Sequence, residues 1–269
     1  MTSPSAVVVA DSVTPGGARV TTVQVTMHRF VLSELNTHRV FSRNSASSRA
    51  VPVARQIERV VNDPALPIEF GSKRAGMQAG PPLDQEAHQD ALATWLSARD
   101  AAVEAARRLA DLGVHKQVTN RLLEPFMWHT VIVTATDWNG FWSQRCSPLA
   151  QPEIRLAAEA MRAAVQGSTP LEVDFGEWHL PYVSDLDRTE VPTIELLQRI
   201  SAARCGRVSY LNHERTRDLD DDLRLFDRFV TARPAHASPL EHVATPAAGG
   251  GAVVGNLRGW LQLRHLVLA

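Results

Sequence analysis

Residues 18–30, ARVTTVQVTMHRF, decide the fold class of this 269-residue chain. Val23, Val25 and Met27 alternate along this stretch with threonine and glutamine. A period of two is typical of a β-strand that buries one face, so we expect a half-buried strand here. Residues 129–135, HTVIVTA, predict a second strand.

Helical patterns surround these strands. Residues 84–112 carry the clearest one, which ends at Gly113. A second begins at Pro152 and runs to Gly167, because proline favours the first position of a helix. The stripe of the first helix consists of Leu92, Leu96, Val103, Ala106 and Leu109. We expect further helices at 53–61, 193–204 and 222–232, a long loop at 62–83, and a short helix or strand at 255–267.

The mixture of strands and long helices predicts one α/β (α+β) domain over residues 1–269, built on a mixed sheet. Residues 1–17 are expected to be a flexible leading segment. They lack the basic start and the long apolar run of a signal peptide. No stretch of the chain approaches the roughly 20 apolar residues of a membrane span.

The composition limits the classes of partner. The formal net charge is −1, whereas surfaces that bind nucleic acid or membranes are strongly basic. Cys146 and Cys205 are the only cysteines and form no Cys-x-x-Cys pair, which excludes a disulfide framework and a thiolate zinc site. We therefore expect a cytoplasmic protein that binds small molecules, not nucleic acid or membranes.

Four polar clusters are candidates for a binding site. Residues 37–50, THRVFSRNSASSRA, combine a histidine and three arginines with an asparagine and several serines. Arginine forks and serine hydroxyls suit phosphate groups. The other clusters are Asn120-Arg121, residues 137–148 (DWNGFWSQRCSP) and residues 236–242 (HASPLEH). Singly, each cluster is also typical of a solvated face, structural ion pairs or a capped helix start. The chain has no glycine-rich nucleotide motif and no His-x-x-x-His metal spacing.

Taken together, the clusters resemble the flavin-dependent thymidylate synthases. The signature of this family is Arg-His-Arg, seven residues, then Ser, a small residue and Arg. Here Thr37-His38-Arg39 is followed by seven residues and Ser47-Ser48-Arg49, with a threonine in place of the first arginine. Residues 120–154 are similar to the following block of the family, and Arg121 and Arg145 fall on its two nucleotide-binding arginines.

Two further blocks match the family in a different order. An Ala-Arg-Val-Ser-Tyr turn and a His-x-[Ser/Thr]-Pro-x-Glu-His stretch usually stand near the N-terminus, but here they fall at residues 202–212 and 236–242. The blocks are therefore predicted to be circularly permuted, which a fold tolerates where its termini lie close together. The sequences of the first two blocks, residues 37–50 and 120–154, resemble a divergent branch of the family from phages and nucleoside-antibiotic pathways. That branch includes the UMP/dUMP C5-methylase of polyoxin biosynthesis.

The resemblance implies reductive methylation at C5 of a uridine 5′-monophosphate-type nucleotide, UMP and/or dUMP. It implies FAD as cofactor, 5,10-methylenetetrahydrofolate as carbon donor, NADPH as reductant, and a homotetramer whose sites combine several subunits. Arg145 would be catalytic, because a guanidinium beside the pyrimidine stabilises the charge that develops on the ring. The substrate would be held by Ser47, Ser48, Arg49, Arg121 and Arg145. FAD would be held by His38, Arg39, Asn44, Asn139, His236, Ser238 and Glu241, with Asn139 shifted by one position because Gly140 stands where the family has an asparagine.

Two other functions stay open at this point. Cys146 could attack C6 of the pyrimidine, as in the unrelated cysteine-dependent thymidylate synthases. Alternatively, the chain could be a non-catalytic module that binds nucleotides or nucleic acid and has lost the flavin. Thr37 is shorter than the arginine it replaces, so we expect open space beside the nucleotide and acceptance of UMP as well as dUMP.

Overall fold

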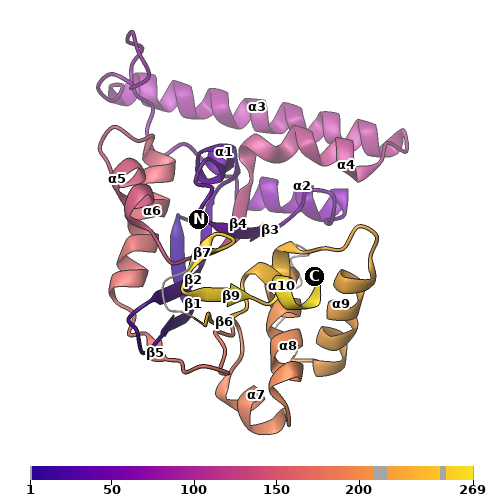
Figure 1. Ribbon diagram of the computed structural model, residues 1–269. Coiled ribbons are helices and arrows are strands. Elements are labelled where there is room, and N and C mark those ends of the chain that lie inside the picture. Colours follow the sequence, from indigo (N-terminus) through magenta and orange to yellow (C-terminus); the bar gives the residue numbers. More distant parts are fainter. Residues whose placement is uncertain (1, 209–216, 249–252, 269) are drawn as a thin grey trace.

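A five-stranded mixed sheet lies at the centre of the computed structural model, which describes residues 2–208, 217–248 and 253–268 (Figure 1). The strand order is β3-β4-β2-β1-β5. β1 and β5 are parallel and the other neighbours are antiparallel. The expected α/β class with a mixed sheet is confirmed. The strands are β1 (Ser5–Val13), β2 (Arg19–His28), β3 (Ser42–Ser45), β4 (Trp128–Ala135) and β5 (Leu171–Glu172).

The expectation of a flexible leading segment is wrong for residues 5–13. They form β1 and pair with β2 from Ser5 opposite Thr26 to Val13 opposite Arg19, with one irregularity between Val8 and Ala10. β-Branched residues such as the valines of this stretch favour extended structure. β2 provides the backbone hydrogen-bonding partner that β1 needs.

Both faces of β2 are covered. Val23, Val25 and Met27 are buried on the side of α6 (Pro152–Gln166), which packs on β1 and β2. Thr22 on the opposite face is also fully buried, and its hydroxyl lies 2.8 Å from Nε2 of His179. The expected strand is confirmed, and Gln24 and Thr26 on its polar face are only partly buried, but Thr22 on that face is buried more deeply than a half-buried strand predicts. The C-terminal part of the chain covers the polar face.

A chain of buried hydrogen bonds joins this C-terminal part to the sheet. Nδ1 of His179 is 2.8 Å from Oγ of Ser12, and the Thr22 hydroxyl is 2.6 Å from that of Thr134. Oγ1 of Thr134 lies 2.8 Å from Nδ1 of His242. Burial lowers the pKa of both His179 and His242 to about 3, so both rings are neutral at physiological pH.

A second apolar cluster joins α2 (Val53–Asn62), α3 (Gln85–Asp111) and η2 (Asn120–Phe126). The side chain of Asp84 caps α3 by accepting the Ala87 N–H, and α3 crosses the top of Figure 1. Val103 and Ala106 are the fully buried members of its predicted stripe, while the other members are only partly buried. Residues 63–84 contain no helix or strand apart from one isolated bridge.

The C-terminal part of the chain packs around two helices, α8 (Ile194–Arg207) and α9 (Leu219–Thr231). Residues 255–267, expected as a helix or a strand, contain both. No helix within the described ranges is long and apolar enough to cross a membrane. The remaining elements are η1 (Arg29–Val31), α1 (Leu32–Asn36), α4 (Lys116–Thr119), α5 (Asn139–Arg145), α7 (Asp185–Glu190), η4 (Ser238–Glu241), β6 (Ala244–Pro246), β7 (Val253–Val254), β8 (Leu257–Arg258), β9 (Trp260–Gln262) and α10 (Arg264–Val267).

Candidate active site

Residues 37–50, the signature segment, run from the end of α1 through β3 to the turn before α2. Buried Asn120 holds this segment from behind, since its Nδ2 donates to the carbonyl oxygens of Ser48 at 2.7 Å and Val51 at 2.9 Å. Asn44 ties the segment to α8 by donating to the carbonyl oxygen of Cys205 at 2.8 Å. The segment is therefore fixed on both sides by hydrogen bonds between side-chain amides and backbone carbonyls.

The larger of two neighbouring cavities, of about 510 Å³, lies between the signature segment and the HASPLEH segment. Five predicted site residues line it, although they come from stretches almost two hundred residues apart: Asn44, Ser47, Arg49, His236 and Ser238. His115, Gln117, Gly206 and Phe229 also line it and were not predicted from the sequence. Part of the 202–212 block, residues 209–212, lies outside the described residues.

One wall of the larger cavity is aromatic. The His236 ring stacks on Phe229 with a centroid distance of 6.1 Å and an interplanar angle of 12°. Gly206 allows this arrangement, because a Cβ there would lie 2.3 Å from the Phe229 ring. Ser238 donates from its hydroxyl to Oδ1 of Asn44 at 3.5 Å on the polar side. Such a cavity can hold a flat ring with polar edges.

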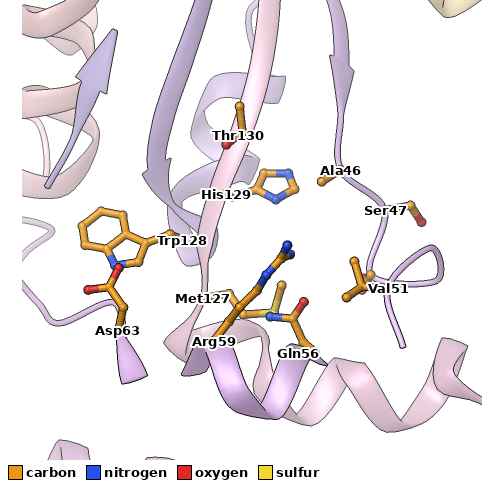
Figure 2. Close-up of a pocket in the computed structure, with 11 residues that line it drawn as sticks. Ala46, Ser47, Val51, Gln56, Arg59, Asp63, Met127, Trp128, His129 and Thr130 are labelled. Carbon is orange, nitrogen blue, oxygen red and sulfur yellow. The ribbon is translucent and has the colours of Figure 1, made fainter. Parts of the chain in front are cut away.

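A smaller cavity, of about 210 Å³, lies between the signature segment, α2 and β4 (Figure 2). Ser47 lines both cavities. Most polar residues of the smaller cavity were not predicted from the sequence, among them Gln56, Arg59 and His129. Burial lowers the pKa of His129 to about 3, which leaves the ring neutral at physiological pH. Gln56 and Arg59 stand on a short amphipathic helix, where nothing in the local pattern marks them as part of a site.

A single carboxylate oxygen, Oε1 of Glu124, accepts hydrogen bonds from two predicted substrate residues. The Ser48 hydroxyl donates to it at 2.5 Å and Arg121 at 2.7 Å, and Arg29 completes the group at 3.2 Å. Burial raises the pKa of Glu124, but the Ser48 hydrogen bond and the two arginines outweigh this and hold it below its usual range. Ser48 lines the smaller cavity, whereas Arg121 is exposed and lines neither cavity.

Arg145 and His38 form a separate cluster at the end of α1. Arg145 donates from Nε to Nε2 of His38 at 3.0 Å and from a terminal nitrogen to Oγ1 of Thr37, also at 3.0 Å. It also donates to the carbonyl oxygen of Glu34 at 3.2 Å. Burial, together with the nearby charges of Arg145 and Arg43, lowers the pKa of His38, which keeps this ring neutral. Arg145 and His38 line neither cavity.

Thr37 is exposed, so the open space expected beside the nucleotide stays a prediction. Its hydroxyl donates to the carbonyl oxygen of Glu34 at 2.7 Å and accepts a hydrogen bond from Arg145. A second guanidinium at this position, as in the family signature, would face that of Arg145. The short side chain therefore serves as a hydrogen-bond partner of the predicted catalytic arginine.

Four predicted FAD residues lie outside both cavities: His38, described above, and Arg39, Asn139 and Glu241. Arg39 is exposed, and Asn139 is exposed in the first turn of α5. Glu241 forms an ion pair with Arg264 and accepts a hydrogen bond at its carbonyl oxygen from Gln262. The chain by itself therefore brings together three members of the predicted flavin set, Asn44, His236 and Ser238, and leaves the other four outside the cavities.

The thiols are poorly suited to nucleophilic attack. Burial raises the pKa of Cys146, and Glu159 adds to this increase while Arg162 opposes it. A raised pKa leaves little thiolate at neutral pH. Cys205 is completely buried, and neither cysteine lines either cavity. Within the described part of the chain, no three His, Cys, Asp or Glu side chains are grouped as metal ligands would be.

Comparison with known proteins identifies a family match. Residues 14–171 match the family model described as "Thymidylate synthase complementing protein", a segment that contains the signature segment and residues 120–154. No curated protein sequence matches the chain. A UMP/dUMP methylase PolB from Streptomyces cacaoi bound with 5-Br dUMP is 22% identical over 55% of this chain and 66% of its own, just under two thirds, with a TM-score of 0.44. The same methylase bound with 5-Br UMP is 18% identical over 61% of this chain and 89% of its own, with a TM-score of 0.48.

Proposed function

Because the chain belongs to the thymidylate synthase complementing protein family, we propose that it is a flavin-dependent methyltransferase. Its substrate is a uridine 5′-monophosphate-type nucleotide, UMP and/or dUMP, and the methyl group is added to C5. The observation that carries this proposal is the meeting of the signature and HASPLEH segments around one cavity. Their contact residues Asn44 and Ser238 are 194 positions apart in the chain.

The residues of the larger cavity fit a flavin. A stacked pair of rings, a hydroxyl, an amide and a guanidinium match a flat heteroaromatic group with polar edges. Gly206 keeps the backbone close to the aromatic wall. His236, Ser238 and Asn44 would hold FAD, which supplies the reducing electrons of the reaction when bound. His38, Arg39, Asn139 and Glu241 stay proposed flavin residues in an assembly of several subunits, since they lie outside this cavity in one chain.

Substrate activation is proposed for Arg145. Carbon C5 of a uracil ring is a poor nucleophile until the ring carbonyls gain negative charge, and a fixed guanidinium stabilises that charge. Three hydrogen bonds, to His38, Thr37 and Glu34, already orient the guanidinium of Arg145. A fixed donor of this kind needs little reorganisation during the reaction. Ser47, Ser48, Arg49 and Arg121 are the proposed nucleotide contacts.

The remaining components follow from the family. Methylenetetrahydrofolate is proposed as the carbon donor, NADPH as the reductant and a homotetramer as the assembly. The alternative with a covalent cysteine is disfavoured by the raised pKa of Cys146 and by its position outside both cavities. A non-catalytic module that has lost the flavin would neither bind FAD nor methylate the nucleotide, so both measurements separate it from our proposal.

The proposal is tested with purified protein, FAD, NADPH, methylenetetrahydrofolate and UMP or dUMP. We expect FAD binding in a fluorescence titration and a 5-methyl nucleotide by mass spectrometry. Arg145→Ala should abolish methyl transfer and keep FAD binding, because its proposed partner is the pyrimidine ring. Cys146→Ser is the matched control and should stay active. Absence of flavin binding by the wild-type protein would refute the proposal, and an inactive Cys146→Ser variant would favour the covalent route.

A further inference from the structure

The smaller cavity contains a cation without a partner. Arg59 lines it from α2 and is half-buried. Among the residues that the structure describes, no carboxylate forms an ion pair with its guanidinium and no acceptor is hydrogen-bonded to it. Figure 2 shows the side chain extending from α2 toward the His129 ring on β4. A charge held in this way away from bulk water favours an anionic ligand.

Two neighbouring polar side chains also lack partners. Gln56 and His129 line the same cavity and are each only 2% exposed. Oε1 of Gln56 and Nε2 of His129 are buried without a hydrogen bond from the described residues. Buried polar atoms in folded proteins are nearly always paired. A bound molecule that donates and accepts hydrogen bonds would satisfy these atoms.

The charged groups around the cavity determine whether its ligand is an anion or a cation. Burial lowers the pKa of Arg59, repulsion by nearby Arg55 adds to this effect and Glu58 opposes it, while the guanidinium remains charged. The neutral His129 ring adds no competing cation. Asp63 also lines the cavity, but its carboxylate accepts hydrogen bonds from the backbone N–H and the hydroxyl of Thr2. Figure 2 shows Asp63 beside Trp128, on the other side of the cavity from Ser47.

The size of the cavity limits the ligand to a compact group. A volume of about 210 Å³ is below the range of roughly 300–1,000 Å³ that holds a whole small-molecule ligand. The two cavities share Ser47, so the rest of a larger molecule can leave the smaller cavity at that residue. Arginine is over-represented where proteins bind phosphate groups, because its fork gives two parallel hydrogen bonds.

We propose that the smaller cavity binds a phosphate group and that Arg59 is its principal charge partner. The group comes either from a nucleotide monophosphate or from free phosphate. Its assignment to the nucleotide substrate rests on the proposed function, whereas the anion site itself does not. In that assignment the sugar and base of the substrate leave the smaller cavity at Ser47, next to the proposed flavin site.

The test compares Arg59→Met with Arg55→Met. Both variants remove one positive charge from α2, but Arg55 is exposed and lines neither cavity. Calorimetric titrations with inorganic phosphate and with UMP are run at one ionic strength. We expect Arg59→Met to bind both ligands about 10- to 100-fold more weakly, the usual range for a lost hydrogen bond to a charged group. Arg55→Met should bind as the wild type does, and Arg59→Lys should fall between the two because it keeps the charge and loses the fork.

Thermal melting separates a binding role from a structural one. Without ligand, Arg59→Met should melt at or above the wild-type temperature, because a half-buried cation without a partner is replaced by an apolar side chain of similar length. A large decrease in melting temperature, unchanged binding of phosphate by Arg59→Met, or no binding by the wild type would overturn the proposal. FAD binding and methyl transfer by the wild type are measured in parallel. Their absence, with phosphate binding still dependent on Arg59, would refute the proposed function alone.

Discussion

Acid should destabilise this protein well above the range in which its carboxylates titrate. His129, His179 and His242 are buried, and burial lowers the pKa of each from 6.5 to about 3. A histidine with a lower pKa in the folded state binds its proton more readily when the chain unfolds. Its contribution to stability is therefore complete above pH 6.5 and is lost as the pH falls from 6.5 toward 3.

The size of the effect follows from these values. At pH 5 an unfolded histidine with a pKa of 6.5 is almost fully protonated, whereas the folded ring with a pKa of about 3 is almost fully neutral. Relative to pH 7, linkage gives a loss of about 2 kcal/mol for each ring, or about 6 kcal/mol for the three. Typical domains have about 5–15 kcal/mol of stability in total. Acidification to pH 5 should therefore remove a large share of it.

Urea unfolding followed by circular dichroism at pH 7, 6 and 5 measures this loss at constant ionic strength. His242→Asn should reduce the difference in unfolding free energy between pH 7 and pH 5 by about a third, because it removes one of the three titrations. His88→Gln is the control, since His88 is exposed. A wild-type loss below about 1 kcal/mol, or an equal effect of both variants, would refute the reasoning.

Two further substitutions test the site. Gly206→Ala should destabilise the protein by about 1–3 kcal/mol and weaken FAD binding, because the added Cβ meets the Phe229 ring. Gly140→Ala has open space around its Cβ and should be neutral or slightly stabilising, as urea unfolding of both variants would show. Thr37→Val should slow methyl transfer by about five- to tenfold, because Arg145 loses one hydrogen bond worth about 1 kcal/mol. Thr94→Val on α3 also removes a threonine hydroxyl that donates to a backbone carbonyl, and it should leave turnover unchanged in the same assay.

Local patterns predicted much of the fold because helix and strand periods depend on neighbours in the sequence. β2, β4, α3 and α6 lie where the spacing of apolar residues places them. β1 was missed because its structure depends on pairing with β2, which no periodicity within residues 1–17 reveals. The burial of Thr22 depends on His179, which is 157 positions away, so the sequence could not show that the second face of the sheet is covered.

The site also contains residues that the sequence predicted and residues that only the structure reveals. The polar clusters, together with their resemblance to the family, indicated Asn44, Ser47, Arg49, His236 and Ser238, which do line one cavity. Arg59 was missed because it looks like any solvated arginine of an amphipathic helix. Only the tertiary structure shows that it lines a cavity with β4, while Arg55, four positions earlier, is exposed.

The HASPLEH segment shows why such a motif does not assign roles by itself. His236 and His242 are six positions apart in one segment, but His236 lines the larger cavity and His242 is completely buried. Thr134 on β4 decides the difference, because its hydroxyl is hydrogen-bonded to Nδ1 of His242 and holds that ring against the sheet. Loss of His242 should therefore act on stability first, and loss of His236 on ligand binding. Similar residues in one motif thus take different roles according to what the facing strand offers them.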